Sequence, residues 1–157
     1  MAIEIARAHL KKWGMDDKIQ EFPVSSATVE LAALAAGVIP ARICKTLSFK
    51  HADGCVLLQI AGDAKIDNSK FKKAFGLKAT MLTPDEVLDY TGHAVGGVCA
   101  FGIARSDVKI YADISLKRFT TVFPACGSSN SAVELTPEEL YRVSEADGWV
   151  DVCKDWE

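Results

Sequence analysis

The chain has 157 residues, of which 49% are apolar and 25% charged, and a formal net charge of −3 at pH 7. This length and apolar content predict a single globular domain over residues 1–157 with a substantial core. The slightly acidic balance excludes broad electrostatic capture of nucleic acid, because that mode of binding needs many lysines and arginines to neutralise phosphates. Any contact with RNA is therefore expected to be small and local.

The first fifteen residues carry charges throughout and contain no uninterrupted apolar run. A signal peptide or a bilayer span requires such a run. We therefore expect a soluble, cytoplasmic protein that makes no contact with a membrane.

The five cysteines are widely spaced and never form a Cys-x-x-Cys motif, which argues against a disulfide framework, a zinc knuckle and a dithiol redox pair. They are Cys44, Cys55, Cys99, Cys126 and Cys153. None of His9, His51 and His93 lies in a Ser/His/Asp arrangement or at the spacing of a metal-ligand pair. The sequence therefore predicts buried, reduced thiols and neither a metal site nor a cofactor.

Two helices are predicted in the first quarter of the chain. Apolar residues at helical spacing over residues 2–15 predict a helix that ends at Gly14. The second helix begins after a cap at Ser26 or Thr28 and ends at Gly37, a residue type that favours the left-handed conformation found after a helix.

A β-hairpin is predicted next. Apolar and polar residues alternate from Ile43 to Phe49, a tight turn follows at Asp53-Gly54, and residues 55–61 are almost entirely apolar. A strand that is apolar on both faces is typical of the centre of a sheet.

The rest of the chain predicts a mixture of helices and strands separated by two glycine-containing loops, at residues 96–102 and 126–130. Loops of this composition usually lie where the backbone approaches another group closely. The predicted helices cover residues 67–75, 84–90 and 137–146, and the predicted strands cover residues 79–82, 108–112, 120–124, 132–135 and 150–152.

Three short motifs follow one another along the chain: Thr28-Val-Glu30 at the start of a helix, Arg42-Ile-Cys-Lys45-Thr-Leu at the start of a strand, and Gly-Gly-Val-Cys-Ala-Phe-Gly from Gly96 to Gly102. Their order and separation resemble the YbaK/prolyl-tRNA synthetase-associated editing family. Residues 111–116 and 126–140 also resemble that family's closing strands and last helix, so the resemblance covers roughly residues 22–140.

The resemblance implies an α+β fold in which helices surround a mixed, mostly antiparallel, barrel-like sheet. It also implies metal-independent trans-editing, in which the ester bond of a misacylated tRNA, of the Ala- or Cys-tRNA-Pro type, is hydrolysed. The implied partner is the acceptor end of a tRNA that carries a mischarged amino acid. A synthetase or translation factor is a further implied partner, and a monomer is expected.

Hydrolysis of an ester needs donors for the oxyanion and an anchor for the tRNA end. With the resemblance, the catalytic candidates are Lys45 as the anchor and the backbone of Gly96, Gly97 and Gly102 as the oxyanion site, with the lysine and the loop facing one another. The substrate-binding candidates are Thr28, Thr46, Val98, Phe101, Asp113, Gly127, Ser128 and Ser129.

Each candidate also has an ordinary structural interpretation. The glycines can form a tight crossing between elements, Lys45 can protect a strand edge, Asp113 can cap the next turn, and the serines can supply turn hydrogen bonds. Ala100 stands where the family loop often has proline. This difference keeps a second hypothesis open, a non-catalytic module that binds aminoacyl-tRNA or a small ligand, and the thiol count alone supports a third, a cysteine-based redox protein.

Overall fold

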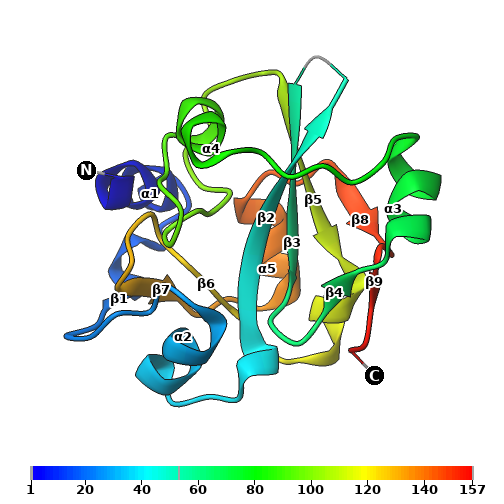
Figure 1. Cartoon of the computed structure of the whole chain (residues 1–157). Coiled ribbons are helices and arrows are strands. Elements are labelled where there is room, and N and C mark those ends of the chain that lie inside the picture. The colour runs from blue at the N-terminus through cyan, green and yellow to red at the C-terminus, as the bar shows by residue number, and fades with distance from the viewer. Residues whose placement is uncertain (1, 53, 157) are drawn as a thin grey trace.

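The computed structural model describes residues 2–52 and 54–156, which form a curled, mixed sheet with helices packed around it (Figure 1). The α-helices are α1 (Ala2–Lys11), α2 (Val29–Ala36), α3 (Asn68–Phe75), α4 (Pro84–Thr91) and α5 (Pro137–Val143). Short 3-10 helices cover Asp16–Lys18, Pro40–Arg42 and Ile114–Arg118. The strands are β1 (Ile19–Glu21), β2 (Ile43–His51), β3 (Gly54–Ala61), β4 (Lys65–Ile66), β5 (Val108–Asp113), β6 (Phe123–Pro124), β7 (Ser131–Val133), β8 (Gly148–Val150) and β9 (Cys153–Lys154).

The main sheet has five strands in the order β6-β2-β3-β5-β8. The hairpin β2–β3 is antiparallel, with Cys44 opposite Ala61 and His51 opposite Gly54. The other three pairings of this sheet are parallel, whereas the small sheets β1–β7 and β4–β9 are antiparallel. The predicted mixed, barrel-like sheet is therefore confirmed, but among the described residues the hairpin is the one antiparallel pairing of the main sheet, so the main sheet is not mostly antiparallel.

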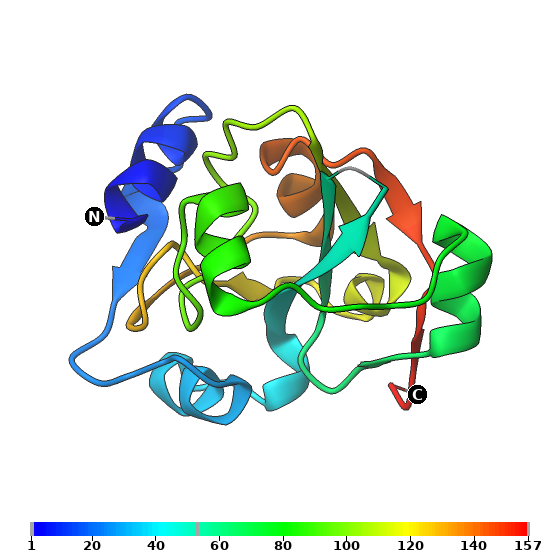
Figure 2. The same cartoon turned by 45° about the horizontal axis from the view of Figure 1, so that its top comes forward.

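The central position predicted for β3 is also confirmed, and its two faces contact different parts of the core. Val56, Leu58 and Ile60 pack in a cluster with residues of α1, α3 and α5. Cys55 and Leu57 point the other way, into a cluster with residues of α4 and β5. Because side chains alternate along a strand, helices on both sides of the sheet explain why β3 is almost entirely apolar. Figure 2 shows α4, in green, nearer the viewer than α5, in orange.

The predicted ends of α2, α3 and α4 agree closely with the structure, whereas α1 ends at Lys11 and α5 at Val143, about three residues before their predicted ends. Thr28 caps α2 by accepting a hydrogen bond from the Leu31 N–H, and Gly37 follows the helix in the left-handed conformation. Capping boxes open both α4 and α5, with a proline in the first turn of each. Within the described residues, no helix is long and apolar enough to cross a bilayer.

The short strands were predicted less well. The strand expected at residues 79–82 is a single bridge between Phe49 and Met81, and only two residues of 120–124 form β6. No local pattern predicted β1, β4 and β9, and the strand expected at residues 150–152 lies earlier, at Gly148–Val150. A strand of two or three residues has no alternation to detect, since its pairing depends on distant segments.

Asp113 connects the end of β5 to the C-terminal segment. Its side chain is fully buried, and its two carboxylate oxygens accept hydrogen bonds from the backbone N–H groups of Ser115 and Val152, each at 2.9 Å. The capping role considered for this residue is therefore present in the fold.

Replacing Asp113 with alanine leaves two buried N–H groups without an acceptor. We expect the free energy of unfolding to fall by about 3 kcal/mol, measured by chemical denaturation. Asp85→Ala, at an exposed position in the first turn of α4, is the control and should change stability by less than about 0.5 kcal/mol. An equally small change for Asp113→Ala would contradict the structural role.

Candidate functional site

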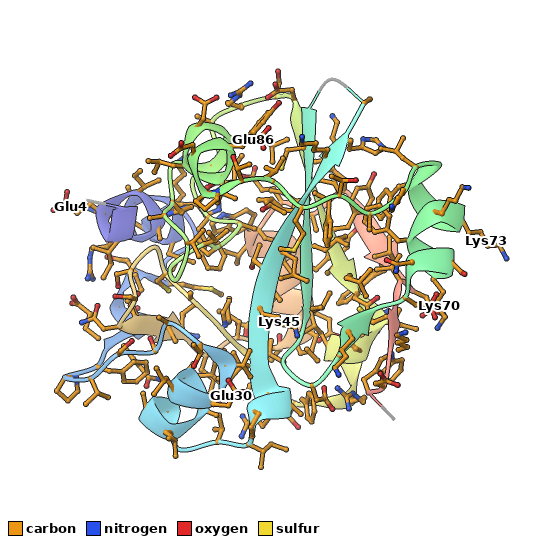
Figure 3. The ribbon with its side chains drawn as sticks, in the orientation of Figure 1. Glu4, Glu30, Lys45, Lys70, Lys73 and Glu86 are labelled. Atoms are coloured by element: carbon orange, nitrogen blue, oxygen red, sulfur yellow. The ribbon has the colours of Figure 1, made fainter. Side chains whose placement is uncertain are left out.

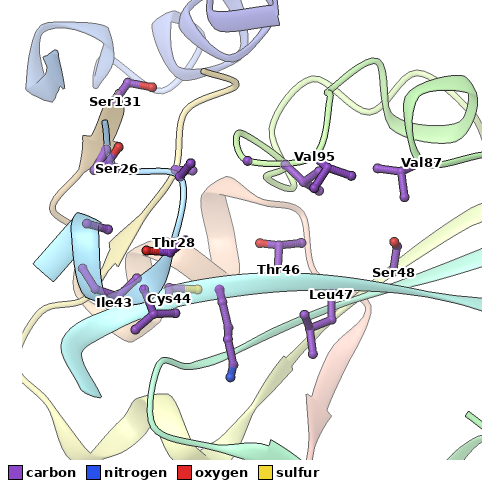
Figure 4. Close-up of a pocket in the computed structure, with 18 of the residues that line it drawn as sticks. Ser26, Thr28, Ile43, Cys44, Thr46, Leu47, Ser48, Val87, Val95 and Ser131 are labelled. Atoms are coloured by element: carbon purple, nitrogen blue, oxygen red, sulfur yellow. The ribbon is translucent and has the colours of Figure 1, made fainter. Parts of the chain in front are cut away.

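A cavity of about 280 Å³ lies between β2, the start of α2, α4 and the loop at residues 95–98 (Figure 4). Most of the side chains that line it are apolar, including Val29, Ile43, Leu82 and Val87. The polar lining residues are Ser26, Thr28, Lys45, Thr46, Ser48 and Ser131. Among the described residues, no carboxylate or imidazole lines the cavity.

One wall of the cavity is made by three chain segments that meet through their backbones. A Cβ atom on Gly97 would lie 2.7 Å from both the Gly127 carbonyl carbon and the Ser128 nitrogen. Gly96 has φ = +100°, and a Cβ there would lie 3.5 Å from the Ala27 Cβ. The glycine-rich loop therefore packs directly against the 127–128 turn and the segment before α2.

Hydrogen bonds fix the segment before α2 to the same turn. The Ser26 N–H donates to the Ser129 carbonyl at 2.6 Å, and the Phe22 N–H donates to the Asn130 carbonyl at 2.7 Å. The Asn130 side chain also donates to the Phe22 carbonyl. Ser129 thus positions the residues that line the cavity without lining it itself.

The structure brings together part of the predicted site. Thr28, Lys45, Thr46, Gly96 and Val98 line the cavity. The other candidates do not line it: Gly97, Phe101, Gly102, Asp113, Gly127, Ser128 and Ser129.

Packing explains the second half of the glycine-rich loop. Phe101 is fully buried, and a Cβ on Gly102, which has φ = +74°, would lie 2.4 Å from the Ile5 Cγ2 atom of α1. Glycine is required there for close contact with α1. Ala100, which stands where the family often has proline, is buried beside Leu57 and Val87 and does not line the cavity.

Three serines that line the cavity were missed as site residues: Ser26, Ser48 and Ser131. Ser26 was considered only as a helix cap, a position that Thr28 occupies. Ser48 follows the alternation of β2 and lies on the same face as Thr46, so the strand pattern contained a usable signal.

The first half of the loop carries free backbone donors. The Gly97 N–H donates to the Ala94 carbonyl, but within the described part of the chain the N–H groups of Gly96 and Val98 have no protein acceptor. Figure 4 shows Thr46 directed from β2 toward the loop that carries Val95. The residues at the edge of the cavity thus include two backbone donors that no described protein group occupies.

Lys45 lies on β2 near the start of α2 (Figure 3). It pairs with Ile60 of β3, whereas Thr46 pairs with Gln59, so the two side chains leave β2 on opposite faces. The expectation that the lysine and the glycine-rich loop face one another is therefore not met, since the loop lies on the Thr46 side.

The Lys45 ammonium is half-buried and forms no ion pair with any described residue. Burial lowers the pKa of Lys45, and smaller effects of Cys153, Asp63 and Glu30 raise it. Asp63 is already paired with Arg118 at 2.6 Å. Lys45 is therefore a cation that can accept an external anion.

Cys99 and His93 lie close together, a contact that the sequence did not reveal. The Cys99 Sγ is 3.6 Å from the His93 Nε2, which is also 2.8 Å from the Phe101 carbonyl oxygen. Burial lowers the pKa of His93 and raises the pKa of Cys99 to about 12. A neutral imidazole cannot activate this thiol as an imidazolium would, and Cys99 stays protonated at neutral pH.

Comparison with known proteins supplies the family. The family described as aminoacyl-tRNA editing domain matches residues 24–143 of the chain. The uncharacterized protein YwhH of Bacillus subtilis (strain 168) is 55% identical over 158 residues, which cover 100% of both chains. The proline–tRNA ligase of Thermosipho melanesiensis is 36% identical over 126 residues, which cover 80% of this chain and 22% of the ligase.

Solved structures agree with this match. A protein proposed to be a trans-editing enzyme for prolyl-tRNA synthetase superimposes with a TM-score of 0.88 at 28% identity, over 98% of this chain and 97% of that chain. The hypothetical protein APE2540 superimposes with a TM-score of 0.79 at 24% identity, over 93% and 99% of the two chains, which shows the shared fold alone.

All five cysteines are free and buried, so we expect them to resist modification. At pH 8 the native protein should react with Ellman's reagent far more slowly than the protein unfolded in guanidinium, which should expose five reactive thiols. Fast modification of Cys99 in the native state would instead revive the redox hypothesis.

Gly97→Ala should destabilise the wall of the cavity, since its Cβ would meet backbone atoms that cannot move independently. We expect the midpoint of thermal unfolding to fall by about 5 °C or more. Gly148→Ala is the matched control, because its Cβ would make only ordinary contacts of 3.5–3.6 Å with Tyr111. Equal midpoints for the two variants would contradict the close crossing.

Proposed function

The chain belongs to the aminoacyl-tRNA editing domain family, and we propose that it acts in trans, hydrolysing the ester bond of a mischarged tRNA in the cavity beside β2. Membership of the family confirms the expected aminoacyl-tRNA deacylase. The proposed location of the reaction rests on the N–H groups of Gly96 and Val98, which lie at the edge of the cavity and have no acceptor among the described residues.

These two N–H groups are proposed to form the oxyanion site. Water adds to the carbonyl carbon of the ester, and the carbonyl oxygen becomes negatively charged. The bond between this carbon and the ribose oxygen then breaks, and the ribose oxygen takes a proton. Donors fixed in advance by the fold stabilise such a charge more than water does. The role first assigned to Gly97 passes to its neighbours, because its own N–H is occupied by the Ala94 carbonyl.

Lys45 is proposed to hold the phosphate of the terminal nucleotide. Its ammonium is half-buried and lacks an ion-pair partner in the described part of the chain, so a phosphate would satisfy it. Since its side chain leaves β2 on the face opposite Thr46, the lysine anchors the tRNA end beside the cavity and does not contact the ester.

The cavity offers no protein carboxylate or imidazole, among the described residues, to act as a general base. We propose that the ribose hydroxyl next to the ester assists the attack of water. The same observation supports the second candidate function, a module that binds the aminoacyl end without turnover.

The substrate is proposed to be tRNA-Pro charged with the wrong amino acid, alanine or cysteine by the resemblance above. Similarity to a proline–tRNA ligase and to a protein proposed to edit for prolyl-tRNA synthetase supports this choice. A monomer that acts in the cytoplasm, with residues 1–157 as one editing domain, completes the proposal.

Lys45→Ala should lower kcat/KM for deacylation by about 100-fold, because a tRNA end that is not anchored is misplaced at the oxyanion site. The measurement is release of labelled amino acid from tRNA-Pro charged with alanine, cysteine, serine or proline. Lys65→Ala, an exposed lysine on the neighbouring strand β4, is the control and should retain activity.

Full turnover by Lys45→Ala would refute the anchoring role. Binding of charged tRNA without hydrolysis of any substrate by the wild-type protein would favour the binding module instead.

A further inference from the structure

The lining of the cavity differs from one end to the other. Ser26 and Ser131 lie at the end near the start of α2, whereas Val87 and Val95 lie at the end near α4 (Figure 4). Alanines flank both serines, since Ala27 follows Ser26 and Ala132 follows Ser131 in the sequence, and Ala32 and Ala125 also line the cavity. This end of the cavity is therefore suited to a short group.

Ser26 is distinguished from the other hydroxyl groups by its burial and by its lack of a partner. The residue is 8% exposed, and within the described residues its Oγ is buried without any hydrogen-bond partner. Its backbone is nevertheless fixed, since the N–H donates to the Ser129 carbonyl at 2.6 Å. A buried hydroxyl in this state destabilises the protein unless something satisfies it.

The neighbouring hydroxyls already have structural roles. The Thr28 Oγ1 accepts the hydrogen bond that caps α2, and the Ser131 Oγ accepts a hydrogen bond from the Ser128 hydroxyl at 2.6 Å. Ser26 has neither kind of partner, so its hydroxyl is the group at this end that a ligand would satisfy.

The end of the cavity near Ser26 favours a neutral ligand group. None of the described lining residues is an aspartate or a glutamate, so a substrate ammonium placed there would lose its hydration without meeting a counter-charge. A neutral hydroxyl can both donate to Ser26 and accept from it.

We propose that Ser26 sets the amino-acid specificity of the deacylase by hydrogen-bonding a hydroxyl on the short side chain of the edited residue. The inference rests on the proposed function and adds serine to the alanine and cysteine that the resemblance implies: serine is preferred over alanine, with cysteine between them because a thiol is a weak donor and acceptor. A site that hydrogen-bonds a substrate hydroxyl discriminates against an analogue that lacks the hydroxyl, because the protein group is then left unpaired.

The test compares kcat/KM for tRNA-Pro charged with serine and with alanine, using the wild type and Ser26→Ala. The wild type should prefer serine, and Ser26→Ala should reduce that preference by about tenfold while changing the alanine rate by less than about twofold. Ser69→Ala, at an exposed position on α3 remote in sequence from the cavity, is the matched control.

Thermal unfolding of Ser26→Ala gives a second readout. Its midpoint should equal or exceed that of the wild type, since the substitution removes an unsatisfied buried hydroxyl. A clear fall in the midpoint would show that the hydroxyl has a partner in the folded protein and would overturn the inference.

Other outcomes also decide the matter. An equal loss on both substrates would show that Ser26 contacts a part common to all aminoacyl esters, and an unchanged preference would show that it contacts neither side chain. Either result overturns the inference but leaves the deacylase intact. Failure of the wild type to release any amino acid would overturn the proposed function as well.

Discussion

The candidate site depends on a backbone crossing that has no space for a side chain. Gly97 lies so close to Gly127 and Ser128 that even a Cβ would meet their backbone atoms at 2.7 Å. This contact brings the glycine-rich loop to the turn that also holds Ser26 through the Ser129 carbonyl. The glycine-rich loop lies about 70 residues after Ser26 in the sequence, and the 127–128 turn lies about 100 residues after it. Together these three segments form one wall opposite β2.

The chemistry follows from what that wall exposes. The described part of the cavity presents backbone donors and hydroxyls but no carboxylate or imidazole, and the half-buried ammonium of Lys45 lies on the opposite face of β2 from Thr46. Such a lining suits a neutral ester whose charge develops only during the reaction. The phosphate of the terminal nucleotide is assigned to Lys45, on the opposite face of β2. The anchoring of the tRNA end is therefore separate from the cleavage of the ester bond.

Local patterns predicted the elements that have strong local signals. The hairpin, the caps at Thr28 and Gly37 and the helix after Pro84 were all correct, because turn residues and periodicity act over a few positions. The site was predicted in part: Gly102 and Asp113 serve packing and backbone hydrogen bonds. Ser26 was missed because its importance arises from burial, and the segment that holds it does so through the Ser129 carbonyl, a contact about 100 residues away in the sequence that no local pattern encodes.

The most direct test is a crystal structure with a non-hydrolysable analogue in which an amide replaces the ester of a 3′-aminoacyl adenosine. The carbonyl oxygen of the analogue should lie within hydrogen-bond distance of the Gly96 and Val98 N–H groups, between their loop and Thr46 of β2. Binding of the analogue elsewhere, for example in the polar cavity beside His9 and Arg105, would contradict the placement of the reaction beside β2.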